Sequence, residues 1–126
     1  MMLLTIEEII RMHAMMVERT GGARGLRDRG LLESAIYSTQ ISFEGIEKYP
    51  SIEEKAARYA YSLISNHAFI DGNKRIGILV MLTTLDLNDI TLQFTQQELI
   101  SLGLNLARGD MDYEKTLEWI EKHKIE

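Results

Sequence analysis

The chain has 126 residues, of which 45% are hydrophobic and 26% charged; its net charge is −5 and it contains no cysteine. This length predicts a single domain over residues 1–126 with one hydrophobic core. The lack of cysteine excludes disulfides, thiolate metal sites and a cysteine nucleophile. The negative charge argues against direct nucleic-acid binding, which depends on Lys and Arg neutralising phosphates.

The first residues and the most apolar stretch indicate where the protein works. Met1 to Leu4 is followed by Thr5 and two acids, without the basic region or the length of a signal peptide. The stretch from Ile76 to Leu82 is about a third of the length that a bilayer span requires. We therefore expect a cytoplasmic protein with no membrane partner.

Three capping boxes predict helix starts, because in each a hydroxyl can accept from an unpaired amide and a glutamate can reach back. They are Thr5/Glu8, Ser51/Glu54 and Thr95/Glu98. After the first, apolar residues recur at helical spacing as far as Val17, and Gly21 is expected to end the helix. A loop rich in glycine and arginine then leads to Asp28, the expected N-cap of a second helix.

The second half of the chain predicts further helices. They are expected over about Ile52–Asn66, from near Asn73 to Asn88, near Gln96–Ala107 and near Tyr113–His123. The helix that begins near Asn73 is apolar on nearly every side, as expected for a helix surrounded by others. The fold class is therefore all-α, a compact helical bundle with a buried central helix. The N-terminus of such a helix is a natural place for a ligand.

A chemically rich loop immediately precedes that central helix, with the sequence His67-Ala68-Phe69-Ile70-Asp71-Gly72-Asn73-Lys74-Arg75. A helix start offers unpaired amides and the positive end of the helix dipole, which attract an anion. Gly72 allows close backbone approach, and Asn73 can cap the helix or donate its amide. Lys74 and Arg75 add positive charge suited to phosphate oxygens.

The remaining side chains of the loop suit phosphate-group transfer. Asp71 can hold a Mg²⁺ ion together with waters and a nucleotide. His67 is the candidate general base that removes a proton from an acceptor hydroxyl. Phe69 is expected to turn inward and anchor the loop against the core.

Each of these residues also has a plainer interpretation. Asp71 could cap the helix, and Lys74 with Arg75 could be a solvated pair, although cations at a helix N-terminus oppose the dipole. His13 lies on the apolar stripe of the first helix and is interpreted as a hydrogen-bonded core histidine. His123 is expected in solvent near a helix end. The Gly/Arg-rich loop before Asp28 is either an ordinary surface loop or a target-docking loop.

The pattern His-x-Phe-x-Asp-Gly-Asn-x-Arg resembles the signature of the Fic superfamily, and the likeness extends over the whole chain. Lys74 in the variable position makes it most similar to the Doc (death-on-curing) branch, the toxins of toxin–antitoxin pairs. The resemblance implies a transferase that uses ATP and Mg²⁺, with a cognate antitoxin as partner. It assigns His67 as the base, Asp71 as the Mg²⁺ ligand, Gly72 and Asn73 to the anion site, and Lys74 and Arg75 to the phosphates.

Two positions bear on which group is transferred. Most Fic proteins transfer AMP to a protein hydroxyl, and they carry glycine where Lys74 stands and a second arginine where Ile78 stands. In the Doc branch, the same change accompanies phosphate transfer from ATP to a threonine of a translation factor, elongation factor Tu. The sequence thus favours phosphotransfer, with AMP transfer as the alternative. Gly72 stands where the best-known Doc motif has alanine.

A third interpretation, of a different class, is a catalytically inactive Fic-fold module that binds a partner protein. Self-restrained Fic proteins carry a (Ser/Thr)-x-x-x-Glu-(Gly/Asn) helix. The nearest approach in this chain is Glu44-Gly45, with Gln40 in the hydroxyl position. Restraint of an active toxin is therefore expected to come from the antitoxin.

Overall fold

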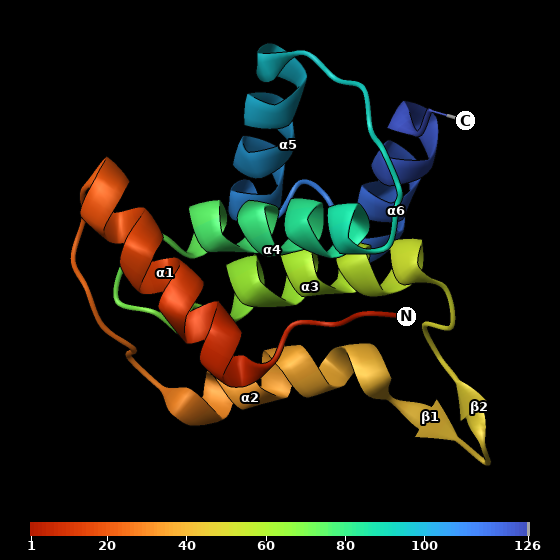
Figure 1. Cartoon of the computed structure of the whole chain (residues 1–126), viewed down its shortest axis with the longest axis horizontal. Helices are drawn as coiled ribbons and strands as arrows, with labels where there is room; N and C mark the ends of the chain where they lie inside the picture. The colour runs from red at the N-terminus through yellow and green to blue at the C-terminus, as the bar shows by residue number, and fades with distance from the viewer. Residues whose placement is uncertain (126) are drawn as a thin grey trace.

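The computed structural model describes residues 1–125, which form six α-helices, one short 3-10 helix and one small hairpin (Figure 1). The elements are α1 (Ile6–Thr20), α2 (Arg29–Tyr37), η1 (Ser38–Gln40), β1 (Ser42–Phe43), β2 (Ile46–Glu47), α3 (Ile52–Asn66), α4 (Asn73–Leu87), α5 (Gln96–Arg108) and α6 (Tyr113–His123). The expected all-α class is confirmed. Within the described residues, no helix is both long and apolar enough to cross a bilayer.

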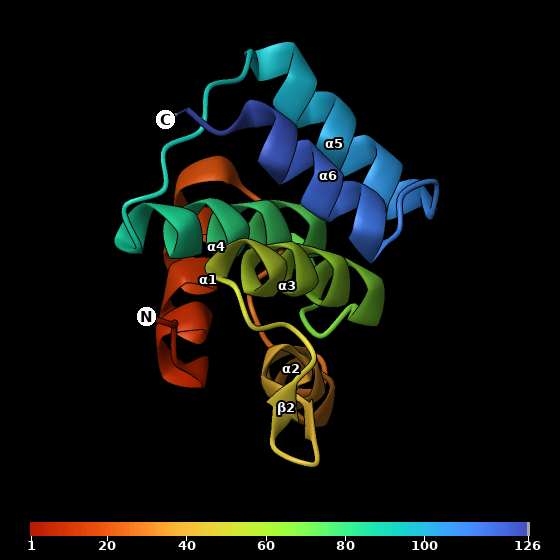
Figure 2. The same cartoon turned by 90° about the vertical axis from the view of Figure 1, so that its right-hand side faces the viewer.

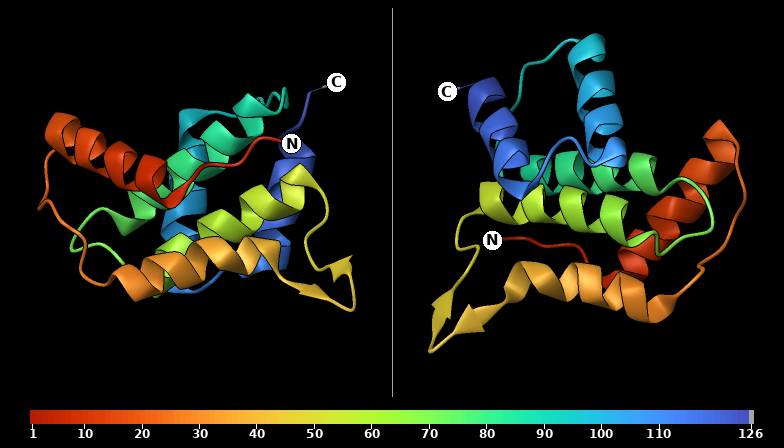
Figure 3. Two further views of the ribbon diagram at one scale, coloured as in Figure 1. Left: turned by 60° about the horizontal axis from the view of Figure 1, so that its bottom comes forward. Right: turned by 180° about the vertical axis from the view of Figure 1, so that it is seen from behind.

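Helices α3 and α4 lie side by side and antiparallel in the middle of the molecule (Figures 1 and 2). Helices α1 and α2 pack on one side of this pair, and α5 and α6 pack on the other (Figure 3). Each side has its own cluster of buried side chains, and α3 and α4 contribute to both clusters. The short connection between α3 and α4 is the loop that carries the predicted site.

The helix starts follow from the capping residues. At Thr5, Ser51 and Thr95 both hydrogen bonds of the predicted capping box are present. Asp28 accepts from the backbone N–H of Leu31 and starts α2, as expected. Each such cap is worth roughly 0.5–2 kcal/mol, so these local contacts alone define where most of the helices begin.

A glycine sets the spacing between the two central helices. A Cβ at Gly77 would lie 2.6 Å from Ile64 Cγ1 and 3.2 Å from the Ala60 carbonyl oxygen. On the facing side of α3, Ala57 and Ala60 are fully buried. The absence of a side chain at position 77 therefore lets α4 approach α3 closely, which fixes the separation of the helix ends that flank the loop.

The central helix α4 is buried on the sides that face its neighbours, with Ile76, Val80 and Met81 fully inaccessible. Three other apolar side chains of α4, Ile78, Leu79 and Leu82, are only partly buried and line an open pocket between α1 and α5. The predicted buried central helix is thus present, with one apolar face left open.

The hairpin between α2 and α3 had no counterpart in the expectations from sequence. Its two-residue turn is Glu44-Gly45, with φ of 52° and 80°, the positive values that tight hairpin turns require. Phe43 and Ile46 form a cross-strand pair and are 77% and 74% exposed. Behind the hairpin, the buried Lys55 ammonium donates to the Thr39 and Tyr49 carbonyls and to Glu47.

The expectation that His123 lies in solvent is wrong. Its side chain is only 9% exposed, stacks on the Trp119 ring, and has Nδ1 2.7 Å from the Trp119 carbonyl oxygen. Its Nε2 lies 2.7 Å from Glu98 on α5. The Trp119 ring four residues earlier and the facing α5 cover the imidazole, and its hydrogen bond helps lower the Glu98 pKa to about 2. This contact joins α5 to α6.

Candidate active site

The loop between α3 and α4 turns the chain through two left-handed backbone positions. His67 ends α3 with φ 51° and ψ 48°, and Gly72 precedes α4 with φ 77°. Glycine suits the second position because it has no Cβ to strain the left-handed conformation. A Cβ at Gly72 would also lie 3.0 Å from Met16 Cε on α1. The loop is therefore fitted closely against α1.

Two residues of the loop anchor it in the core. Ala68 is fully buried and Phe69 is 2% exposed. The side chain of Asn73 closes the loop, since its Oδ1 accepts from the Phe69 N–H at 3.0 Å and its Nδ2 donates to the Phe69 carbonyl at 2.9 Å. The polar atoms of Asn73 thus hold the loop backbone. The phosphate contact predicted for Asn73 would then come from its main-chain N–H, and it stays a prediction.

A histidine from α1 reaches the same loop. His13 is 2% exposed, in agreement with its interpretation as a core histidine. Its Nε2 lies 2.7 Å from the Asp71 carbonyl oxygen, and its ring stacks on Phe69 with a centroid distance of 3.8 Å. Sequence reasoning missed this contact because 58 residues separate His13 from Asp71. The only sequence signal was a polar residue on an apolar helix face.

The side chains that the sequence assigned to the chemistry point outward from these anchors. One open pocket of about 500 Å³ is lined by His67, Ile70, Asp71, Gly72, Asn73, Lys74 and Arg75. The structure thereby brings together every residue that the sequence assigned to the base, the metal and the phosphates. The pocket opens at the N-terminus of α4, where unpaired amides and the helix dipole favour an anion.

Asp71 is ionised at neutral pH. The N–H groups of Ala23 and Gly72 donate to its carboxylate at 3.1 and 2.8 Å, and the Arg75 guanidinium lies 4.0 Å away. These contacts lower the pKa of Asp71 below its usual value, the backbone hydrogen bonds contributing most. Its side chain is 49% exposed, so the carboxylate is open to a ligand.

The donor set fits Mg²⁺ in the manner that the sequence suggested. Within residues 1–125 no cluster of three or more His, Asp or Glu side chains could hold a metal ion alone. An exposed, ionised Asp71 beside a helix N-terminus suits instead an ion that keeps several waters and shares phosphate oxygens.

The segment from Thr20 to Ala23 contacts two of the residues that line the pocket, Asp71 and Arg75. Arg75 donates to the Thr20 hydroxyl and to the Gly21 carbonyl, while the Ala23 N–H binds Asp71. A Cβ at Gly22 would lie 2.6 Å from Asp71 Oδ2 and 2.9 Å from Arg75 Nη2. Asp71, the predicted Mg²⁺ ligand, and Arg75, the predicted phosphate-binding arginine, therefore both lie against this segment.

The rest of the α1–α2 connection runs alongside the loop (Figures 1 and 3). The N–H groups of Arg27 and Asp28 donate to the Ala68 carbonyl, and the Ile70 N–H donates to the Gly25 carbonyl. The Arg27 side chain donates to the His67 carbonyl at 2.8 Å. Arg27 thus satisfies the C-terminal end of α3, which is a structural use of one arginine in this loop.

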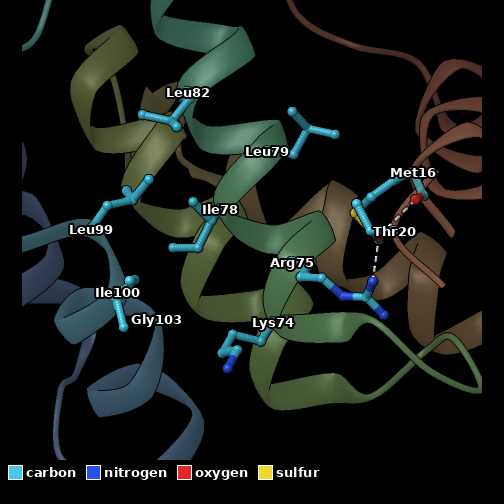
Figure 4. Close-up of a pocket in the computed structure, with 10 residues that line it drawn as sticks. All are labelled: Met16, Thr20, Lys74, Arg75, Ile78, Leu79, Leu82, Leu99, Ile100 and Gly103. Carbon is cyan, nitrogen blue, oxygen red and sulfur yellow. Dashed lines mark hydrogen bonds between the residues drawn. The ribbon is translucent and has the colours of Figure 1, made fainter. Parts of the chain in front are cut away.

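A second, apolar pocket adjoins the first and shares Lys74 and Arg75 with it (Figure 4). It has a volume of about 390 Å³ and is lined by Met16, Thr20, Lys74, Arg75, Ile78, Leu79, Leu82, Leu99, Ile100 and Gly103. The stem of Lys74 packs toward Gly103, where an added Cβ would lie 3.3 Å from Lys74 Cδ. Ile78 lines this apolar pocket and not the polar one.

Comparison with known proteins gives consistent matches. A protein-family model described as "Fic/DOC family" matches residues 3–85, which include α1 to most of α4 and the whole loop. "Toxin Doc" of Mycolicibacterium smegmatis is 40% identical over 72 residues, 57% of this chain and 55% of that toxin. "Protein kinase doc" of Escherichia phage P1 is 28% identical over 116 residues, 92% of this chain and 90% of that protein.

Proposed function

The chain belongs to the Fic/Doc family, and from this premise we propose that it is a Doc-like toxin that phosphorylates a protein. The substrate would be a Thr or Ser hydroxyl of a translation factor of the elongation factor Tu class, and the phosphate donor ATP. The observation that carries the proposal is the pocket in which His67, Asp71, Lys74 and Arg75 meet at the N-terminus of α4.

Each residue has a defined task in this reaction. Lys74, Arg75 and the amides that follow Gly72 bind the phosphate oxygens of ATP. Asp71 would hold Mg²⁺, which supplies neutralisation of the phosphate charge when bound. His67 takes the proton of the attacking hydroxyl. That oxygen forms a bond to the γ-phosphorus, the bond to the β-phosphate oxygen breaks, and ADP leaves with the electron pair.

The choice of phosphate over AMP rests on Lys74 and Ile78. Ile78 brings no second guanidinium to the nucleotide and lines the apolar pocket toward α5. Lys74 adds a flexible cation at the edge of the polar pocket. Compared with Fic proteins that carry glycine and arginine at these two positions, this chain gains an ammonium group and lacks a planar guanidinium. This difference changes how a triphosphate is held.

The test uses ATP labelled separately at the γ- and α-phosphorus, incubated with Mg²⁺, the protein and purified elongation factor Tu. Label that reaches the factor only from the γ position is the expected result. Label from the α position alone would replace phosphotransfer by AMP transfer, the second candidate. Intact mass spectrometry of the factor then gives the mass of the transferred group and the number of sites.

The proposal also includes a cognate antitoxin. Glu44-Gly45, the nearest approach to a self-restraint motif, forms the hairpin turn at the opposite end of α3 from the loop (Figure 1). An apolar helical face of the antitoxin fits the apolar pocket, where it would lie against Lys74 and Arg75. Ile100→Glu places a charge in that pocket at a half-exposed position. We expect this variant to fold, to inhibit growth, and to resist neutralisation by the co-expressed antitoxin; unchanged neutralisation would contradict this placement.

A further inference from the structure

The orientation of one peptide group connects the buried side of the loop to its reactive side. The carbonyl of Asp71 points inward to His13, with 2.7 Å between the oxygen and Nε2. The N–H of the same peptide group, which belongs to Gly72, points the other way and donates to Asp71 Oδ1 at 2.8 Å. The peptide bonds of the described chain are trans, so the carbonyl and N–H of one group necessarily point in opposite directions.

The proton on His13 is assigned by its partner. A carbonyl oxygen can only accept, so Nε2 must carry the hydrogen and donate. The imidazole itself is fixed by its stacking on Phe69, with an interplanar angle of 12°. The donor therefore has a defined position as well as a defined direction.

The backbone beside this peptide group has little stiffness of its own. Gly72 adopts φ 77°, and glycine populates positive φ about as readily as negative φ because it has no Cβ. Nothing in the covalent structure of an Asp-Gly pair keeps its peptide plane in one orientation. An external contact is needed to hold it, and His13 provides that contact from α1.

From these contacts we infer that His13 is a positioning residue for Asp71. By holding the Asp71 carbonyl, it aims the Gly72 N–H at the carboxylate and so fixes the side chain proposed to bind Mg²⁺. The inference rests on the proposed function for the role of Asp71 but not for the geometry itself. His13 acts through the peptide group and touches neither nucleotide nor target.

The experiment compares variants that separate the hydrogen bond from the packing. His13→Phe keeps an aromatic ring against Phe69 and removes the donor, whereas His13→Gln keeps an N–H donor at the place of Nε2 and removes the ring. The first measurement is the ¹H–¹⁵N resonance of the Gly72 amide in the ligand-free protein. The second is the Mg²⁺ concentration that gives half-maximal transfer from ATP.

We expect His13→Phe to shift the Gly72 resonance and to raise the half-maximal Mg²⁺ concentration about 10-fold or more, the usual effect of losing a contact that orients a metal ligand. His13→Gln should leave both close to wild type. Ile9→Val, a change at a fully buried site on the same helix, is the matched control. It should cost some stability without moving the Gly72 resonance.

Two outcomes would overturn the inference: an unmoved Gly72 resonance in His13→Phe, or equal shifts in the Phe and Gln variants, which would indicate packing alone. Should His13→Phe not fold, His13→Leu supplies a smaller side chain without a donor and the same two readings apply. The amide measurement needs no activity. A protein that transfers nothing from ATP yet shows the expected shifts would refute the proposed function and leave the positioning role standing.

Discussion

The two ends of α3 each meet an irregular segment that one buried polar side chain holds in place. At the loop end, His13 binds the Asp71 carbonyl; at the hairpin end, Lys55 binds the Thr39 and Tyr49 carbonyls. The outer surfaces are opposite in character. The loop exposes His67 and Lys74 over a buried aromatic anchor, while the hairpin exposes Phe43 and Ile46 over a buried cation.

The two ends therefore differ in the side chains that surround the fixed backbone. Both segments are fixed by contacts with a buried polar side chain, so rigidity alone does not distinguish them. Each end has an open pocket with charged side chains, but every residue lining the pocket at the loop end comes from the loop and the first turn of α4, whereas the pocket at the hairpin end is shared with α6. In the hairpin itself, the exposed pair Phe43 and Ile46 is apolar, and the buried Lys55 ammonium stabilises the fold through its contact with Glu47. The predictions below test this separation of chemistry from support.

The largest effect is expected at His67. His67→Ala should lower the rate of target modification by about 10²–10⁴-fold, because the general base is lost. The side chain is exposed, so the free energy of unfolding should change little. His67→Asn controls for the left-handed backbone, which asparagine tolerates better than alanine. If growth inhibition on expression survives His67→Ala undiminished, catalysis by this residue is not its cause.

Next in size is the loss of the buried cation at the other end. Lys55→Met removes the donor to two carbonyls and should lower the free energy of unfolding by roughly 2–4 kcal/mol, measured by urea denaturation. Activity per folded molecule should remain at the wild-type level. Glu47→Gln, which alters only the half-exposed partner of Lys55, should cost less than about 1 kcal/mol. A large loss of activity in folded Lys55→Met would show that the hairpin end also affects catalysis, and would contradict the prediction.

A smaller effect is expected from a pair of glycines with similar backbone conformation. Gly22 (φ 111°) and Gly45 (φ 80°) both have positive φ, but only a Cβ at Gly22 meets Asp71 and Arg75. Gly22→Ala should displace the Thr20–Ala23 segment or the two side chains that it contacts, and lower target modification by about 10- to 10²-fold, the scale of an ångström-sized misplacement. Gly45→Ala should show only the backbone strain, as lost stability. Equal activities would mean that the close contact of Gly22 with Asp71 and Arg75 is not needed for activity.

The smallest effect is expected away from both ends, at the contact between α5 and α6. The pKa of Glu98 is lowered from 4.5 to about 2, mainly by its hydrogen bond with His123. A lowered pKa stabilises the fold above the ordinary value, and this contribution is lost as the pH falls toward 2. The melting temperatures of wild type and Glu98→Gln should therefore differ most above about pH 5 and converge toward pH 2. A constant difference would mean that the ionisation of Glu98 does not contribute to stability.

The helices were predictable from sequence because their starts are encoded locally. Thr5, Ser51 and Thr95 each define a start within four residues of chain. The loop chemistry was equally local, since all the residues that line the pocket lie within one stretch of nine residues. Contacts between segments that are distant along the chain could not be predicted from the sequence.

Two features depended on such distant contacts. His13 lies far along the chain from Asp71, and Glu98 is 25 residues from His123. The hairpin escaped prediction for another reason. Its strands have two residues each and their side chains are exposed on both faces, so no alternating pattern arises. Only the turn residues Glu44-Gly45 carried a signal.

Gly77 has no part in the chemistry and lies one turn inside α4, against Ile64 on α3. Because it sets how closely these helices approach, it also sets the reach between His67 at the end of one helix and Lys74 at the start of the other. A larger side chain at this position would leave the loop sequence unchanged and still alter the distance between the two helix ends. The geometry of the site in this chain therefore depends on position 77, which lies outside the motif.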